Sequence, residues 1–286
     1  MKGKRRGSLG VKIALIFGAS SAVLFVILTV IIVLQLNSSI SNLTESMSEE
    51  IVSARAGEIS NWIVGHKDEI KVMTQHPAIL DNDNGTIEMY IRSLNKLKNK
   101  DFESVFFVDM QGNSIDDAGT RASLADRAYF QEVAVQGKSF AISNPLISRS
   151  TGNAVFVLMW EARNAANQRI GGMLATVNLA TLSNIAGRIK IGATGYGWVV
   201  DGTGLMIAHP DPDFPMKFNI STASQNGFTG YEEIAAKTKT GEPTIGEVVR
   251  PDGTLSITIT APIPGTPNWA LGVTVPKAEF YKTVTD

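Results

Sequence analysis

Residues 104–115 read SVFFVDMQGNSI, and residues 196–207 read YGWVVDGTGLMI. Each stretch has an apolar or aromatic run, then Asp-x-x-Gly, then a second run, so that Asp109 and Gly112 match Asp201 and Gly204. Asp and Gly supply the chemistry of a tight turn between paired strands, and each stretch therefore predicts a β-hairpin. The chain contains one structural unit twice.

A second pair of similar segments follows the two hairpins. Residues 154–160 and 172–179 are apolar runs on either side of a turn, as are residues 255–261 and 269–275. Each pair predicts two adjacent antiparallel strands, and a helix start follows each pair. We therefore expect an α+β fold in which a long N-terminal helix precedes two antiparallel-sheet modules in tandem, at residues 80–182 and 183–286.

An apolar segment near the N-terminus predicts a membrane anchor. Ile13 to Leu34 carries no charge, and at about 1.5 Å per residue such a helix spans roughly 30 Å, the thickness of the hydrocarbon core. Basic residues precede it and glutamates follow it, which places residues 1–12 in the cytoplasm and the chain after residue 36 outside. The alternative, a cleaved signal peptide, has a shorter apolar core and a small-residue cleavage site. We expect a single-pass anchor over residues 13–35 in the inner membrane.

Residues 37–79 predict one long amphipathic helix. Apolar residues recur at helical spacing, beginning with Ile40, Leu43, Met47 and Ile51, and Pro77 ends the pattern. Such a stripe serves equally to pack on the chain's own modules or to pair with a second copy.

Composition excludes several classes of function. With 26 basic and 27 acidic residues the net charge is −1, which argues against nucleic acid as a partner. The absence of cysteine excludes disulfides, thiolate metal sites and a cysteine nucleophile. The segment HPDPD at 209–213 suits a proline-rich loop better than a metal site, and GATGYG at 192–197 suits a turn better than a phosphate loop. We expect no enzyme activity, metal or cofactor.

These features, together with DRAYF at 126–130, SNP at 143–145 and TG at 151–152, resemble the double Cache family of bacterial sensor domains over nearly the whole chain after the anchor. The resemblance implies two PAS-like modules against the long helix, with a small-molecule ligand in the membrane-distal one, residues 80–182. It also implies a homodimer through the helix and a transmembrane receptor, most often a methyl-accepting chemotaxis protein. Histidine kinases and cyclic-dinucleotide enzymes are the alternatives. Cytoplasmic signalling partners would then be reached through an output domain beyond residue 286.

The candidate ligand site follows the first hairpin. An arginine such as Arg127 matches a carboxylate with two parallel hydrogen bonds, and the rings of Tyr129 and Phe130 suit a pocket wall or an ammonium group. The alternative is that both rings belong to the core and that Arg127 pairs with Asp126 or Asp117 at the surface. The amino-acid-binding branch of the family has an arginine, one further residue and two adjacent aromatics, which Arg127, Tyr129 and Phe130 match. This resemblance favours the ligand site.

The chain departs from that branch where the branch has acids. Leu146 and Ser148 stand where the branch has an aromatic residue and an acid, and Thr176 stands where an aspartate holds the ligand's amine. A ligand with only a carboxylate, or an uncharged polar ligand, is therefore favoured over an amino acid. The other expected lining residues are Ser143, Asn144, Ser148, Trp160, Thr176 and Asn178, of which Trp160 is equally suited to the core.

Two other classes of protein stay open. A membrane-anchored extracytoplasmic enzyme, such as a hydrolase, would need a nucleophile and a base in a recognisable arrangement. An adhesion module would recognise a macromolecule through an exposed patch. A second transmembrane segment and a signalling domain in the complete gene would favour the receptor over both.

Overall fold

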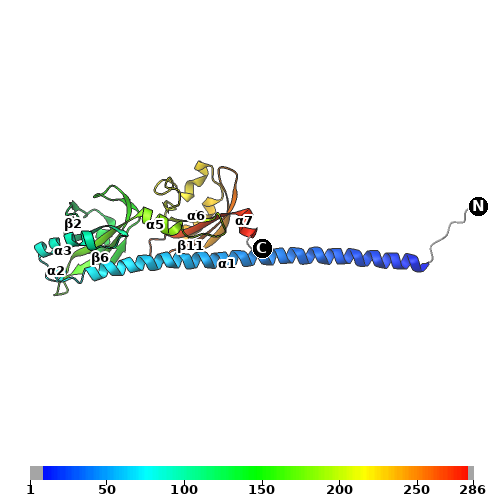
Figure 1. The fold of residues 1–286 in the computed structure, drawn as a ribbon, viewed down its shortest axis with the longest axis horizontal. Coiled ribbons are helices and arrows are strands. Elements are labelled where there is room, and N and C mark those ends of the chain that lie inside the picture. Colours follow the sequence, from blue (N-terminus) through cyan, green and yellow to red (C-terminus); the bar gives the residue numbers. More distant parts are fainter. Residues whose placement is uncertain (1–8, 283–286) are drawn as a thin grey trace, which may run out of the picture.

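The computed structural model describes residues 9–282, as one long helix and two antiparallel sheets that lie one after the other along it (Figure 1). The expected α+β class is therefore confirmed. Most of the basic segment 1–12 that we expect in the cytoplasm, and residues 283–286 of the second expected module, lie outside the described residues.

Helix α1 (Leu9–Met73) runs unbroken through the apolar segment and the amphipathic segment that follows it. The first proline of the chain is Pro77, and there a short helix α2 (Pro77–Leu80) begins, capped by His76 Nδ1, which accepts from the Ala78 amide at 3.2 Å. The N-terminal part of α1 extends alone beyond both sheets (Figure 1). Within the described residues, α1 is the one helix long and apolar enough to cross a membrane.

The first sheet has seven strands, and its central pair is β6 with β7. Its order is β3 (Arg121–Ser123), β2 (Asn113–Asp116), β1 (Phe102–Asp109), β7 (Arg169–Asn178), β6 (Ala154–Arg163) and β4 (Phe140–Ile142), while β5 (Leu146–Ile147) also pairs with β6. Helix α3 (Asn84–Leu97) packs on the same face as α1. The opposite face carries α4 (Ala128–Phe130) and the π-helical turn η1 (Gln131–Val135).

The second sheet has five strands and repeats the topology of the first. Its order is β10 (Thr244–Val249), β11 (Leu255–Pro262), β12 (Ala270–Pro276), β8 (Tyr196–Val200) and β9 (Met206–Ala208). The accompanying helices are α5 (Leu179–Ala186), η2 (Ile220–Asn226), α6 (Tyr231–Thr240) and α7 (Lys277–Lys282). The order β9-β8-β12-β11 reproduces β2-β1-β7-β6, so the repeat predicted from the sequence is confirmed.

The two hairpin turns have the same pattern of hydrogen bonds. Asp109 Oδ1 accepts from the amides two and four residues ahead at 2.9 and 2.8 Å, and Asp201 Oδ1 does the same at 2.8 and 3.0 Å. Gly112 and Gly204 have φ of +84° and +88°, a region that glycine enters without steric cost. Both carboxylates are therefore turn formers, as expected.

The alternation of side chains along the strands gives each sheet two different faces. On β6, Phe156 and Leu158 pack toward α1, in an apolar core that continues into the second sheet through Ile257 and its neighbours. The other face of β6, which includes Val157, packs against α4 and η1 in a separate cluster. Helix α1 is therefore shared by both sheets, whereas each outer face has its own covering.

Candidate functional site

A small cavity lies on the outer face of the first sheet, where α4 and the segment after β5 cover the strands. Its volume is about 20 Å³, room for about one water molecule. Four of the nine expected site residues line it, namely Arg127, Tyr129, Ser148 and Thr176. The other lining residues are Phe106, Ala122, Leu124, Leu146, Arg149, Ser150, Val157 and Leu174.

Arg127 is half-buried in this lining, and one of its side-chain nitrogens has no hydrogen-bond partner among the described residues. It stands immediately before α4 in extended backbone, and its Nε is buried and donates to no described group. The surface pairing considered from the sequence does not form, because Asp126 pairs with Arg149 and Asp117 with Lys98. A buried donor without an acceptor costs free energy. An anionic group in the cavity would supply the missing acceptor.

Tyr129 is buried on α4 with its ring toward the cavity lining. Burial raises the pKa of Tyr129 to about 12, although Arg127 and Arg149 act to lower that pKa. The phenol is therefore neutral at physiological pH and able to donate a hydrogen bond to a ligand. The next residue, Phe130, is buried in the adjoining apolar cluster and does not line the cavity.

Two hydroxyls of the lining, those of Thr176 and Ser148, also form hydrogen bonds with the backbone. Thr176 Oγ1 accepts from the Ser104 amide at 3.1 Å, where the pairing of β1 with β7 shifts register. Ser148 Oγ accepts from the Thr151 amide at 3.3 Å and closes the turn that follows β5. These hydroxyls give the cavity polar lining without negative charge.

Trp160 and Asn178 are placed away from the cavity. Trp160 lies on the face of β6 toward α1, where the ammonium nitrogens of Lys71 and Lys67 are 5.2 and 5.6 Å from its ring centroid. Asn178 caps α5 by accepting from the Ala180 amide at 2.8 Å. The strand assignments were predicted correctly, but the register decides which face each side chain takes.

Ser143 and Asn144 precede β5 and also point elsewhere. Ser143 extends the pairing with β6, because its hydroxyl accepts from the Val157 amide at 2.9 Å. Asn144 Oδ1 accepts from Trp269 Nε1 at 3.2 Å, which joins this loop to the second sheet. The two residues therefore position the segment that covers the cavity without lining it.

Arg149 lines the cavity although no sequence pattern pointed to it. Its guanidinium pairs with Asp126, with Nη2 to Oδ2 at 2.6 Å, and Nη1 also donates to the Ser123 carbonyl at 2.7 Å. A lone arginine in a polar turn has no periodic or motif signal. The apolar lining, in contrast, follows from strand alternation once Val157 and Leu174 are assigned to the outer face.

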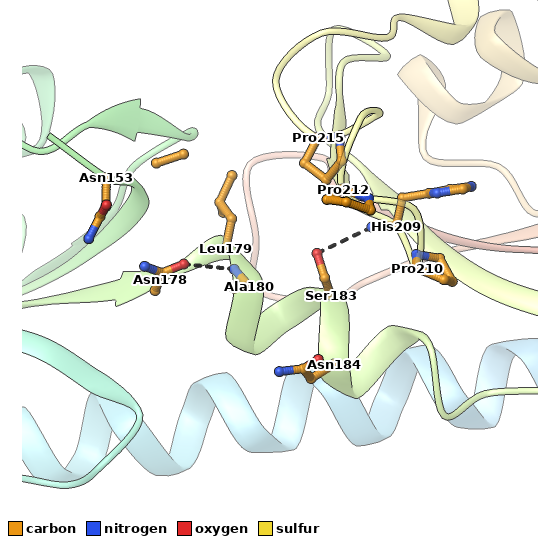
Figure 2. Close-up of a pocket in the computed structure, with 11 residues that line it drawn as sticks. Asn153, Asn178, Leu179, Ala180, Ser183, Asn184, His209, Pro210, Pro212 and Pro215 are labelled. Atoms are coloured by element: carbon orange, nitrogen blue, oxygen red, sulfur yellow. Dashed lines mark hydrogen bonds between the residues drawn. The ribbon is translucent and has the colours of Figure 1, made fainter.

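A larger pocket of about 480 Å³ lies between the two sheets (Figure 2). Residues on α5 and the strand ends line one side, and prolines of the loop after β9 line the other. Two of its polar side chains already have partners: Asn178 accepts from the Ala180 amide, and Ser183 Oγ accepts from the His209 amide at 3.3 Å. No Asp, Glu, Lys or Arg of the described chain lines it. The smaller cavity under Arg127 is therefore the better candidate for a charged ligand.

His209 belongs to an aromatic cluster on the outer face of the second sheet. Its imidazole stacks on Phe214 at 4.3 Å between ring centroids and meets Tyr196 edge-on at 5.1 Å, and in Figure 2 it points away from the pocket. Burial lowers the pKa of His209. Across the described residues, no group of three or more His, Cys, Asp or Glu side chains is arranged to hold a metal ion.

The turn at residues 192–197 receives a carboxylate from the chain itself. Glu279 on α7 accepts from the amides of Ala193 and Thr194 and from the Thr194 hydroxyl. Backbone amides that would suit an external phosphate are thus used to fix α7 to the connection between the sheets. The expected turn is confirmed.

The comparisons with known proteins agree on the fold. The extracellular domain of mmHK1S-Z3, assigned as a histidine kinase, is similar with a TM-score of 0.69 at 16% identity, over 85% of this chain and 98% of that one. The ligand-binding domain of the Pseudomonas fluorescens chemoreceptor CtaA in complex with L-leucine has a TM-score of 0.66 at 20% identity, over 85% of this chain and 99% of that one. The ligand-binding domain of the Pseudomonas aeruginosa PAO1 amino-acid chemoreceptor PctC in complex with GABA has a TM-score of 0.62 at 21% identity, over 81% of this chain and 99% of that one.

Identities this low establish a shared fold and leave the ligand open. The model of the family described as Cache domain (dCache_1) matches residues 31–284. That match includes both sheets and the part of α1 that they share. The chain therefore belongs to the Cache domain family.

Proposed function

We propose that this chain is the sensory part of a transmembrane receptor and that it binds a small carboxylate in the cavity under Arg127. The observation that carries the proposal is the buried Nε of Arg127, which has no acceptor among the described residues. The neutral phenol of Tyr129 and the hydroxyls of Ser148 and Thr176 supply further hydrogen bonds around it. This lining favours a carboxylate or a polar neutral group.

The ligands of similar proteins support a carboxylate as the recognised group. The chemoreceptor domains with L-leucine and GABA hold molecules that carry both a carboxylate and an ammonium group. Here Ser148 and Thr176 stand where the resemblance to the amino-acid-binding branch implies acids, and neither can neutralise an ammonium group. A ligand with a carboxylate and no amine is therefore favoured for this chain.

We place the first sheet in a membrane-distal module, residues 80–182, and the second in a membrane-proximal module, residues 183–286. The apolar N-terminal part of α1 projects past the second sheet, whereas the first sheet lies at the opposite end of the helix (Figure 1). An anchor at residues 13–35 in the inner membrane, with the chain after residue 36 outside, agrees with this arrangement.

Signal transfer would run along α1, which packs on both sheets. The last helix of the second sheet also contacts it, because Tyr281 on α7 donates to Glu45 on α1 at 2.9 Å. A ligand shifts such a structure only by binding one of two arrangements more tightly. The two arrangements must therefore differ by a few kcal/mol at most.

A homodimer through α1 is part of this proposal. Among the exposed apolar residues of the helix, four follow the expected anchor in a row, Ile40, Leu43, Met47 and Ile51, at 38%, 60%, 55% and 46%. Their spacing of three to four residues forms one stripe, on the side away from Val52 and Ala56, which are buried in the core that α1 shares with the sheets. A second copy is the partner that would cover such a stripe symmetrically.

The output that we favour is that of a methyl-accepting chemotaxis protein. The similarity to CtaA and PctC supports it, while the similarity to mmHK1S-Z3 supports a histidine kinase as the second candidate. Fusing the chain to the cytoplasmic half of a chemoreceptor and recording ligand-dependent kinase activity would test the first. A fusion that stays silent with a bound ligand would favour the second.

The binding proposal is tested by thermal-shift measurements on the detergent-solubilised chain against amino acids, short organic acids, amines and nucleobases. A ligand at a hundred times its dissociation constant stabilises by about 2.7 kcal/mol. We expect a shift with a carboxylate that Arg127→Ala abolishes. The matched control is Arg163→Ala, which removes an arginine paired with Glu161 away from the cavity. Unchanged affinity in Arg127→Ala would contradict the site.

A further inference from the structure

The cavity on the first sheet carries more positive charge than a single carboxylate needs. Two guanidinium groups line it, one from Arg127 before α4 and one from Arg149 after β5. Within the part of the chain that the structure describes, no Asp or Glu side chain lines this cavity. The lining thus has net positive charge and no group that would neutralise an ammonium ion.

The present partner of Arg149 is one that a ligand can replace. Arg149 pairs with Asp126 through two contacts, at 2.6 and 3.0 Å. Both side chains are largely open to solvent, at 43% for Arg149 and 63% for Asp126, and exposed ion pairs contribute little to stability. Exchanging the Asp126 carboxylate for an anionic group of a ligand therefore costs little.

We infer that the cavity recognises a small dianion, with one anionic group on Arg127 and the second on Arg149. This inference rests on the proposed function and narrows its ligand class. A ligand amine would lie near two guanidinium groups without a facing carboxylate, and like charges at short range repel. The site therefore selects against amino acids as well as for a second negative charge.

The volume of the cavity shows what must move when such a ligand enters. About 20 Å³ holds one water molecule, so the turn at residues 148–152 has to separate from α4. That turn is closed by its own hydrogen bonds, such as Gly152 N to Ser148 O at 2.9 Å, and it is tied to β3 by the Arg149 bond to Ser123. Once the Arg149 bond to Ser123 is released, these internal hydrogen bonds let the turn move as a unit, with Arg149 carried along to the ligand.

Matched four-carbon ligands test the inference. Calorimetric titration of the full chain in detergent would compare succinate, butyrate and 4-aminobutyrate. These compounds share a propanoate unit and differ in the group at its other end, which is a carboxylate, a methyl group or an aminomethyl group that carries a positive charge. Inorganic phosphate is the second dianion and separates a dicarboxylate site from a phosphate site. We expect one of the dianions to bind at least about tenfold more tightly than butyrate, a difference typical of one charge-assisted hydrogen-bonded pair, and 4-aminobutyrate to bind most weakly.

Two variants distinguish this inference from the proposed function. Arg149→Gln should reduce the ratio of dianion affinity to butyrate affinity from at least about tenfold to about one, while Arg127→Gln should abolish binding of both. Arg163→Gln is the control and should change neither. Equal affinities for succinate, butyrate and 4-aminobutyrate, all lost in Arg127→Gln, would overturn the dianion and leave the carboxylate site standing. Absence of binding by all four compounds, or binding that survives Arg127→Gln, would overturn both.

Discussion

The indole of Trp269 donates to the side chain of Asn144 at 3.2 Å, across the junction of the two sheets. Trp269 is fully buried immediately before β12, and its ring meets Phe156 of the first sheet edge-on at 5.2 Å between centroids. The ring centroid of Phe156 in turn lies 6.2 Å from that of Trp62 on α1. Asn144 belongs to the segment that leads into the cavity lining, so a displacement of that segment acts directly on the second sheet and the helix.

Asn144→Ala should weaken the coupling between the two sheets. The Trp269 Nε1 donor would lose its acceptor, and the free energy of unfolding should fall by about 1 kcal/mol. Ligand affinity should change less than about threefold, because Asn144 does not line the cavity. Hydrogen exchange of β12 with and without ligand is the measurement, and Asn164→Ala, in the β6–β7 turn, is the control. Ligand protection of β12 that persists in Asn144→Ala would refute the coupling.

Arg127→Ala should change stability little although the residue is half-buried. The substitution removes packing contacts, but it also removes a buried Nε donor that has no acceptor. Because these two effects oppose each other, we expect the free energy of unfolding to change by no more than about 1 kcal/mol. Lys98→Met is the contrasting variant, because it leaves the buried Asp117 carboxylate unpaired and should cost about 3–5 kcal/mol. Urea unfolding of both variants checks the comparison. Destabilisation of similar size in the two would mean that Arg127 has a structural partner.

The pKa of His209 predicts a loss of stability in mild acid. Burial holds this pKa below its ordinary value of about 6.5, with Arg250 acting in the same direction and Asp211 opposing it. As pH falls through about 6.5 the unfolded chain therefore binds the proton before the folded chain does. The contribution to unfolding free energy is fully present above that pH and is lost progressively below it.

His209→Asn should flatten this pH dependence. The asparagine oxygen can replace Nδ1, which accepts from the Asp211 amide at 2.9 Å, but it does not titrate. Melting temperatures of both proteins between about pH 7.5 and 5.5 give the comparison, in a window around the ordinary histidine pKa. Parallel curves would exclude His209 as the source.

Met47→Glu should dissociate a dimer formed through α1. The side chain is 55% exposed in the apolar stripe, and a symmetric interface would bring two such charges together. Sedimentation equilibrium of the full chain in detergent should show a dimer, and Met47→Glu should weaken it at least about tenfold, since one buried unpaired charge costs more than 1.4 kcal/mol. Ser53→Glu, exposed on another side of α1, is the control. A monomeric wild-type chain, with and without ligand, would contradict the dimer.

The sequence by itself determined the elements and their repetition. Local patterns were sufficient for the long helix, which ends at Met73 shortly before Pro77, for the Asp109 and Asp201 turns, and for the helices after β7 and β12. Each of these features depends on hydrogen bonds or periodicities among residues that are close together in the sequence, so a local pattern is enough to predict it. The match of Arg127 and Tyr129 to a family pattern also led to two residues that line one cavity.

Only the tertiary structure decided which side chains meet. Thr176 lines the cavity on the outer face of the first sheet while Trp160 packs toward α1, because their places in the β6–β7 register put them on opposite faces. Arg149 reaches the cavity from a turn, and Asn144 meets Trp269, which lies 125 positions further along the chain. Contacts of this kind depend on how sheets pack and how strands register over long separations, and no local pattern in the sequence encodes them.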